Sequence, residues 1–438
     1  MKNYFLLLIS CFLLCACAVP SARQSAPLTD QIQLTATQPR SLQSRKQTKS
    51  AAGLTPSVLE EEQTRYKAMP LPKEMRGVWI ASVENTDWPS KPGLSAQQQR
   101  KEFTDMLDLI KKLNFNTVMV QVRPTADTFW PSDLEPWSYY LTGKQGQAPN
   151  PKYDPLAFMV EEAHKRGLAI HAWFNPFRVQ NNPKAVLSAN HPAKKHPEWI
   201  ITYGGKKYYN PAIAAVRKHA IAVITQAAQN YDLDGIHLDD YFYPYPVKQK
   251  GKNVPFPDST QYKQTGQGKS LAAWRRENVN AFVRDLHQSI KAVKPEMPIG
   301  ISPFGVWRNK SKDPTGSPTR AFSAYDDGLY ADSRLWIEQG WIDYIVPQLY
   351  WHFGHRAAPY GVLLKWWSQE VKRNPNVKLY IGIAAYKHGT EWKDLTELDK
   401  QLAALKQYPN VSGAVFFSAI RIKNNQNNIQ KTLRKYYQ

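Results

Sequence analysis

Cysteine is almost missing from this chain of 438 residues. Its three cysteines are Cys11, Cys15 and Cys17, and the following 421 residues contain none. The main body can therefore form no disulfide and offers no thiolate to a metal. The ten histidines occur in no HExxH or HxxxH spacing, so the sequence predicts neither a metal nor another cofactor.

Two further absences limit the folds and the kinds of membrane attachment that the sequence allows. No glycine-rich phosphate loop follows the first apolar stretch, which argues against a doubly wound open sheet that binds nucleotides. The N-terminal apolar run, Phe5–Leu14, is too short to span a bilayer as a stable helix. Lys2 precedes that run, and this order is typical of an export signal.

The export signal ends in Leu14-Cys15-Ala16-Cys17, which resembles the cleavage box of bacterial lipoproteins. We therefore predict a signal peptide over residues 1–16 and a lipid anchor on Cys17. The alternative is an ordinary signal peptide cleaved near Ala18 or Ala22. Because Ala18, and not aspartate, follows the cysteine, the resemblance implies sorting to the outer membrane, with the protein facing the periplasm.

Residues 17–70 are predicted to be the lipidated cysteine and a disordered linker, and residues 71–438 the folded domain. The linker is rich in Ser, Thr, Gln, Pro and Ala and has one aromatic residue, Tyr66, so it can bury little apolar surface. All 14 tryptophans lie between Trp79 and Trp392. Lys2 and the linker hold 8 of the 57 basic and 4 of the 36 acidic residues, so the domain keeps 49 against 32. This charge favours anionic partners.

The domain alternates between short apolar stretches and amphipathic segments. Near-continuous apolar stretches are typical of parallel strands that are covered on both faces. Eight strands are predicted, at Gly77–Ser82, Thr117–Val122, Ala169–Phe174, Gly235–Asp239, Pro298–Ser302, Asp343–Gln348, Leu379–Ala384 and Ala414–Ser418. Helices are predicted between them, including Pro211–Tyr231, Leu271–Val293, Ala321–Gln339, Tyr360–Lys372, Leu395–Leu405 and Asn425–Tyr436. Eight strands that alternate with helices predict a (β/α)8 TIM barrel with long strand-to-helix loops.

The stretch from Asp234 to Pro246, DGIHLDDYFYPYP, carries the clearest chemistry. Two adjacent carboxylates end the fourth strand and run into a group of aromatic residues. Asp239 shares a strand face with His237 and should point into the barrel mouth, whereas Asp240 begins the loop. We predict Asp239 and Asp240 as an acid/base pair, with Tyr241 and His237 beside them. The alternative is an acid pair that only caps a helix or a loop.

Other strand ends supply aromatic rings that can stack on sugars and polar groups that can bind hydroxyls and amides. The predicted substrate-binding residues are Trp79, Glu84, Gln121, Arg123, Asn175, Arg178, Ser302, Trp307, Gln348, Tyr350 and Trp351. Structural alternatives remain: Trp79 and Trp173 could fill the barrel, and Arg123 could pair with a carboxylate of the barrel. His171 and His237 could equally be satisfied core histidines.

Six stretches in order resemble the glycosyl-hydrolase-like 10 family of bacterial barrels. They are RGVWIASVENTDWPS (76–90), NTVMVQVRP (116–124), AIHAWFNPFR (169–178), DGIHLDDYFYP (234–244), ISPFGVWRN (301–309) and DYIVPQLYW (343–351). The resemblance implies a barrel that cleaves peptidoglycan glycan strands, in particular septal strands stripped of stem peptides. It also suggests proteins of the division site as candidate partners.

The stretch around Asp239 also resembles, distantly, the DGxDxDxE strand of chitinase-type barrels. In those barrels a glutamate is the acid and the 2-acetamido group of the substrate is the nucleophile. Here Tyr241 occupies the glutamate position and His237 replaces an aspartate. Glycoside cleavage normally uses two carboxyl groups, and besides this pair the sequence offers only Glu84 and Asp87.

The sequence therefore predicts a monomeric, lipid-anchored periplasmic glycosidase acting on peptidoglycan, without affinity for nucleic acid. The alternative from another class is a glycan-binding barrel without activity, which the lack of an acid at the end of the seventh strand favours. A lectin-like module for another exported glycan is a third reading.

Overall fold

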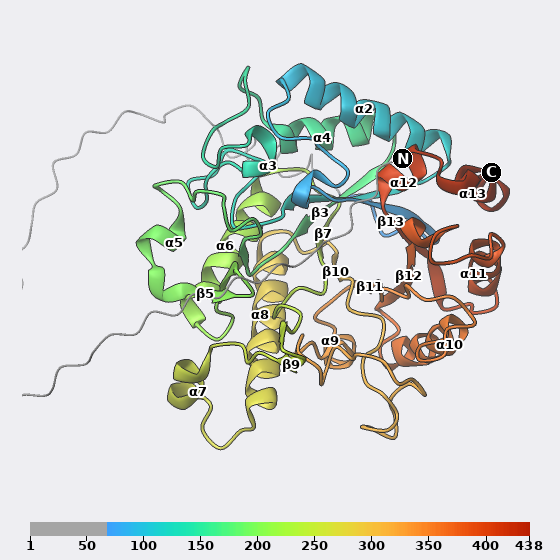
Figure 1. Cartoon of the computed structure of the whole chain (residues 1–438). Helices are drawn as coiled ribbons and strands as arrows, with labels where there is room; N and C mark the ends of the chain where they lie inside the picture. The colour runs from blue at the N-terminus through green and yellow to red at the C-terminus, as the bar shows by residue number, and fades with distance from the viewer. Residues whose placement is uncertain (1–67) are drawn as a thin grey trace, which may run out of the picture. The chain divides into compact units, whose positions relative to one another are not determined.

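The computed structural model describes residues 68–438, which contain a closed barrel of eight parallel strands. The strands follow one another around the barrel in chain order, and β1 pairs with β13 to close it. They are β1 (Met75–Ile80), β2 (Thr117–Arg123), β3 (Ala169–Phe174), β7 (Gly235–Leu238), β10 (Ile299–Ile301), β11 (Tyr344–Ile345), β12 (Lys378–Ala384) and β13 (Val411–Phe417). The predicted (β/α)8 barrel is confirmed, and Figure 1 shows the helices arranged around it.

The barrel strands form where the apolar stretches predicted them, because their side chains are buried both inside the barrel and under the helices. Two glycines make room for large groups in the barrel interior. A Cβ on Gly300 would lie 2.0 Å from the ring of Tyr344, and one on Gly235 would lie 2.6 Å from the ring of His171. The two rings can therefore meet at the barrel axis only because these positions lack side chains.

Three of the longer helices, α2, α4 and α8, begin after residues whose side chains accept hydrogen bonds from free backbone N–H groups. Ser95 and Gln98 form a capping box at the start of α2, and Asp154 caps α4 with Pro155 at its first position. The helices between barrel strands are α2 (Ala96–Lys112), α4 (Pro155–Lys165), α6 (Ala214–Asn230), α8 (Leu271–Val293), α9 (Ser333–Glu338), α10 (Tyr360–Glu370) and α11 (Glu397–Leu405). The chain ends in α12 (Ala419–Lys423) and α13 (Ile429–Tyr437).

Two predicted helices were wrong in extent. Of the helix predicted over Ala321–Gln339, only α9 forms, because Tyr330 takes a positive φ of 52° and Asp332 caps the helix after it. The helix predicted from Asn425 begins at Ile429, because Asn425, Asn427 and Asn428 all have positive φ. Asparagine tolerates this left-handed conformation, which interrupts a helix.

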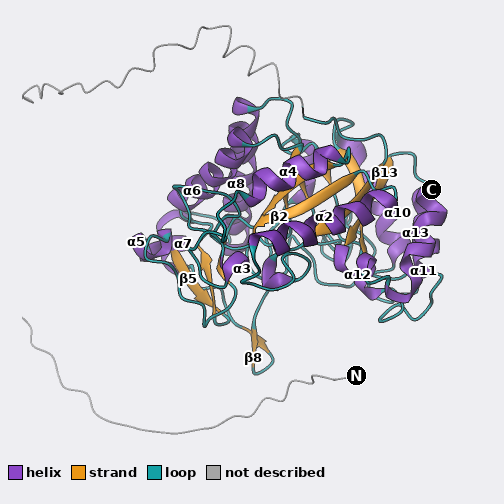
Figure 2. Cartoon of the chain, turned by 90° about the horizontal axis from the view of Figure 1, so that it is seen from above, coloured by secondary structure: helices purple, strands orange, loops and turns teal. Residues whose placement is uncertain are grey.

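The long loops carry secondary structure that the sequence did not predict. The loop after β3 contains β4 (Arg178–Gln180), β5 (Ile200–Tyr203) and β6 (Lys206–Tyr209) in one small antiparallel sheet, followed by α6. The loop after β7 forms a hairpin of β8 (Lys248–Gln249) and β9 (Lys252–Asn253) and a helix, α7 (Ser259–Thr265). Short helices α3 (Tyr139–Thr142) and α5 (Pro192–Lys195) complete the loops. Figure 2 shows β5 and β8 on the same side of the barrel as α3 and α12.

The predicted signal peptide, the lipidation of Cys17 and most of the predicted linker lie outside the described residues. Within residues 68–438, no helix has the length and apolar character needed to cross a membrane.

Candidate active site

A pocket of about 360 Å³ lies at the carboxyl ends of the barrel strands, where active sites of such barrels are found. It is lined by the acid pair and by residues at or after the ends of the other barrel strands. The side chains that line it include Trp79, Thr86, Gln121, Trp173, Arg178, Asp239, Asp240, Tyr241, Ser302, Gln348, Tyr350, Tyr386, Phe417, Ser418 and Arg421. Nine of the predicted site residues therefore meet in one cavity.

Asp239 is held by a directed chain of amides. The N–H groups of Ser82 and Val83 donate to Oε1 of Gln121 at 2.9 and 2.8 Å, so its Nε2 turns to Oδ1 of Asn175. Nδ2 of Asn175 then donates to Oδ2 of Asp239 at 2.5 Å. The backbone N–H of Tyr241 donates to the other carboxylate oxygen at 3.0 Å. Asp239 is thus fixed in orientation and receives two hydrogen bonds that favour its charged form.

Asp240 is placed differently. Its carboxylate accepts a hydrogen bond from the hydroxyl of Tyr245. Burial raises the pKa of Asp240 to about 7, and the neighbouring charge of Asp239 acts in the same direction. Burial also raises the pKa of Asp239, but Arg178, Tyr241 and Asn175 oppose this shift. The environment thus favours the proton on Asp240 and the negative charge on Asp239.

His237 lies beneath the pocket and not in its wall. It is fully buried, and burial lowers its pKa well below the usual range, so the ring is neutral. Nε1 of Trp79 donates to its Nε2 at 3.0 Å, which leaves Nδ1 to donate to the hydroxyl of Tyr344 at 3.1 Å. Tyr344 in turn contacts Nδ1 of His171 at 2.7 Å. The predicted place of His237 beside the acid pair is therefore corrected: it supports Trp79 from inside the barrel.

Aromatic rings form the wall at the ends of β11, β12 and β13. The ring of Phe417 lies 6.2 Å from those of Trp79 and Tyr386 and 6.4 Å from that of Tyr350. Across the pocket, the guanidinium of Arg178 lies 4.4 Å from the centre of the Tyr241 ring. Flat rings beside polar groups suit a sugar, because the faces of a sugar ring are apolar and its hydroxyl groups form hydrogen bonds.

Phe417 and Arg421 were not among the predicted site residues. Phe417 lies within the predicted eighth strand, Ala414–Ser418, and Arg421 lies three residues after its end, so inspection of this strand's carboxyl end and of the residues that follow would have found both. Trp173 and Tyr386 also line the pocket, although neither was predicted to bind substrate. Arg421 forms no ion pair with any residue of the described chain, and its side chain is exposed at the pocket rim.

Five predicted substrate-binding residues do not line the pocket. Asn175 lies behind Asp239, as described. Arg123 is fully buried and forms a two-point ion pair with Glu135 at 2.6 and 2.7 Å, which confirms the structural alternative for this residue. Glu84 is exposed and accepts a hydrogen bond from Asn181. Trp351 packs on Phe304, with ring centres 5.4 Å apart.

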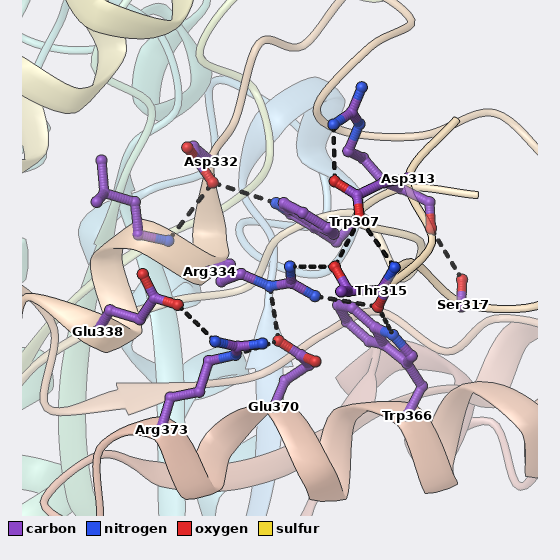
Figure 3. Close-up of polar contacts among 12 residues, drawn as sticks. Trp307, Asp313, Thr315, Ser317, Asp332, Arg334, Glu338, Trp366, Glu370 and Arg373 are labelled. Carbon is purple, nitrogen blue, oxygen red and sulfur yellow. Dashed lines mark hydrogen bonds and ion pairs between the residues drawn. The ribbon is translucent and has the colours of Figure 1, made fainter. Parts of the chain in front are cut away.

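Trp307 belongs to a separate cluster on the loop after β10, shown in Figure 3. The guanidinium of Arg334 lies 3.7 Å from the centre of its ring, and Trp366 stacks beside it at 5.9 Å. Its Nε1 donates to Asp332 at 3.2 Å. The expectation that Trp307 lines the glycan groove is therefore corrected, because cation–π contact and stacking hold the ring inside this cluster.

Few carboxylates line the pocket. Among the described residues that line it, Asp239 and Asp240 alone are acidic. Asp87 lies nearby but behind the wall, where Ser418, Ala81 and Ile420 donate to its oxygens at 2.7 to 2.8 Å. Burial raises the pKa of Asp87 to about 6. Within residues 68–438, no cluster of three or more His, Cys, Asp or Glu side chains could hold a metal ion.

The fold and this acidic, aromatic pocket define a barrel of the glycosidase type. A family model described as "Glycosyl hydrolase-like 10" matches residues 74–397. The chain belongs to this family, which indicates a glycosidase-type function.

Two relatives support this assignment. The chain is 49% identical to "Glycosyl hydrolase YngK" of Bacillus subtilis over 369 residues, which cover 82% of this chain and 71% of the relative. It is 42% identical to "Glycosyl hydrolase DigH" of Escherichia coli K12 over 370 residues, 78% of this chain and 82% of the relative.

Solved structures show the same fold at low sequence identity. The glycoside hydrolase domain of PgaB (BpsB) from Bordetella bronchiseptica matches with a TM-score of 0.54 at 12% identity, covering 84% of this chain and 99% of that one. The catalytic domain of a β-amylase from Paenibacillus polymyxa matches with a TM-score of 0.52, also at 12% identity, covering 84% and 98%. At this identity the likeness shows the barrel fold alone.

Proposed function

We propose that the protein is a glycosidase that cleaves the glycan strands of peptidoglycan, with Asp240 as the acid and Asp239 as its charged partner. The observation that carries this proposal is the unequal environment of the two neighbouring carboxylates. Burial raises the pKa of Asp240 to about 7, while Asn175, Tyr241 and Arg178 favour the charged form of Asp239. Such a pair supplies a proton and a negative charge at neutral pH.

The lack of a third pocket carboxylate among the described residues favours help from the substrate. In this mechanism Asp240 protonates the glycosidic oxygen, and the carbonyl oxygen of the 2-acetamido group attacks the anomeric carbon as the bond to the leaving sugar breaks. Asp239 accepts a hydrogen bond from the acetamido N–H and stabilises the positive charge that develops there. Water then opens the cyclic intermediate and gives its proton to Asp240.

Peptidoglycan is the proposed polymer because its sugars carry 2-acetamido groups and lactyl carboxylates. The acetamido groups suit the proposed mechanism in the pocket. The lactyl carboxylates suit a chain with 57 basic and 36 acidic residues. Septal strands stripped of peptides would present their carboxylates free. We further propose that lipidated Cys17 anchors the protein to the outer membrane, facing the periplasm, where such strands occur.

The rival function is a glycan-binding barrel without activity. The end of β12, Ala384 and Ala385, offers no acid to the pocket, which favours this alternative. Incubation of the protein with peptide-stripped sacculi, followed by mass spectrometry of the soluble products, separates the two. We expect wild type to release fragments, and Asp239→Asn and Asp240→Asn to bind sacculi without releasing them. Binding by wild type without fragments would overturn the hydrolase.

A further inference from the structure

A larger cavity adjoins the acid pocket. It has a volume of about 720 Å³ and is formed by the loops after β7 and β10 together with Tyr203 of β5. Aromatic rings provide much of its wall: Tyr203, Tyr243, Tyr245, Phe256, Phe322 and Tyr330. None of these residues was predicted as part of the site, and none has a role in the mechanism above except Tyr245, which contacts Asp240.

Tyr245 joins the two cavities. Its ring lines the larger cavity, while its hydroxyl donates to Asp240 in the acid pocket. The ring also lies 5.2 Å from the ring of Tyr241, which lines the acid pocket, and 5.5 Å from that of Phe322 in the larger cavity. These ring contacts place the wall of the larger cavity next to the wall of the acid pocket, on the side where a polymer held at Asp240 would extend.

Three of the four charged residues that line this cavity have partners within the protein, whereas the fourth, Lys248, is exposed and forms no ion pair within residues 68–438. Arg275 forms two hydrogen bonds to Asp258, and Asp326 accepts two from Arg308. Asp327 accepts from the backbone N–H and the hydroxyl of Ser323 at 2.8 Å. The cavity therefore offers mainly rings and hydroxyl groups, with one exposed lysine at its wall. This lining suits a polyhydroxylated ligand better than a small ion.

One buried polar group in this wall has no protein partner. The hydroxyl of Tyr243 makes no hydrogen bond to any residue of the described chain, although the side chain is 1% exposed. Buried hydroxyl groups are normally satisfied. This hydroxyl is enclosed by the protein, so it is a polar group behind the aromatic wall and not a contact for a ligand in the cavity.

We infer that the larger cavity is a second sugar-binding site, which takes the continuation of the same glycan strand beyond the bond held at Asp240. This inference rests on the proposed function, because it takes the ligand of the acid pocket to be a glycan. It implies that the enzyme acts on extended strands. Binding energy from the remote sugars would then serve catalysis, so short substrates would lose turnover as well as affinity.

The test uses the full chain and two series of probes of graded length, chitin oligomers and peptide-stripped peptidoglycan strands. Affinity is measured by titration calorimetry in an Asp239→Asn background. We expect octasaccharides to bind about tenfold more tightly than disaccharides. Phe322→Ala, which removes a ring from the cavity, and Ala321→Trp, which fills it, should abolish this gain and leave disaccharide binding unchanged. Phe158→Ala, a half-buried ring of α4 outside both cavities, is the matched control.

The outcomes separate this inference from the proposed function. If glycans bind but affinity does not rise with length, or rises equally in the cavity variants, the second site is wrong while the acid pocket stands. If no glycan of any length binds wild type or the Asp239→Asn protein, the proposed function itself fails. Loss of disaccharide binding in both cavity variants, with folding intact, would also overturn the division into two sites.

Discussion

Nδ2 of Asn175 lies 2.5 Å from Oδ2 of Asp239 and donates a hydrogen bond to it. The amide of Asn175 can point in this direction only because Gln121 donates to its oxygen, and Gln121 is itself oriented by two backbone N–H groups of the loop after β1. Three strands thus fix one carboxylate. Its charge, and through it the pKa of Asp240, depends on residues that need not touch the substrate.

Asn175→Ala should lower kcat/KM by roughly tenfold to a hundredfold, the value of a hydrogen bond to a charged group. Without the donor, the pKa of Asp239 rises further, because the charged form loses stabilisation. The acidic limb of the pH profile of kcat/KM should therefore move to higher pH. Asn374→Ala removes a hydrogen bond to Ile337 far from the pocket and serves as the control. An unchanged pH profile in Asn175→Ala would contradict the role given to the amide chain.

Tyr245→Phe should move the alkaline limb of the pH profile of kcat/KM. The hydroxyl of Tyr245 lowers the pKa of Asp240 by donating to its charged form, so its removal raises that pKa above about 7. As the acid must be protonated to act, activity should persist to higher pH in Tyr245→Phe than in wild type. The pH dependence of product release from stripped strands measures this. A limb that moves to lower pH would show that Asp240 is not the acid.

Asp240→Asn should stabilise the protein at neutral pH while abolishing activity. Folded Asp240 keeps its proton up to about pH 7, whereas in the unfolded chain its pKa returns to the ordinary value of 3.8. Between these values the folded state binds more protons, so the stability of wild type falls as pH rises, by about 4 kcal/mol for the whole window. Asparagine carries no charge and avoids this loss.

Urea unfolding at several pH values measures this difference. The gain of Asp240→Asn over wild type should be complete above about pH 7 and vanish near pH 4. Asp105→Asn, at an exposed position of α2, should show no comparable dependence. A gain of equal size at both ends of the pH range would mean that packing, and not charge burial, separates the two proteins.

Arg421→Gln should reduce affinity for glycans with carboxylates more than for neutral ones. Its exposed side chain lies at the pocket rim and forms no ion pair within residues 68–438, so its charge is available to a ligand. We expect a loss of about tenfold for strands with free lactyl groups and little change for chitin oligomers of the same length. An equal loss for both would assign Arg421 to a sugar contact common to the two polymers.

Arg123→Met should unfold the barrel more easily and should not act through substrate binding. The change leaves Glu135 buried with His219 as its remaining ionic partner, which costs about 3–5 kcal/mol. The double variant Arg123→Met with Glu135→Gln should recover part of this loss. Chemical unfolding and glycan titration of the same samples decide the matter. A stable Arg123→Met protein without affinity for glycans would restore the original prediction that Arg123 binds substrate.

The sequence by itself determined the barrel and the place of the acid pair. Eight apolar stretches alternate with amphipathic helices, and burial on both faces leaves such stretches few other arrangements. Asp239 and Asp240 directly follow one of these strands, so a position at the mouth followed from connectivity alone. The strand ends likewise brought Trp79, Gln121, Arg178 and Tyr350 into the pocket.

Only the tertiary structure decided which residues beside the strands face the pocket and which face one another. Trp307 and Arg123 stand in similar sequence surroundings to true wall residues, but ion pairs and stacking with distant Arg334 and nearby Glu135 turn them away. The proton on Asp240 and the orientation of Asp239 depend on burial and on Asn175 and Tyr245, which approach from different loops. Desolvation and hydrogen bonding between such segments exist only once the chain has folded, so the one-dimensional pattern cannot contain them.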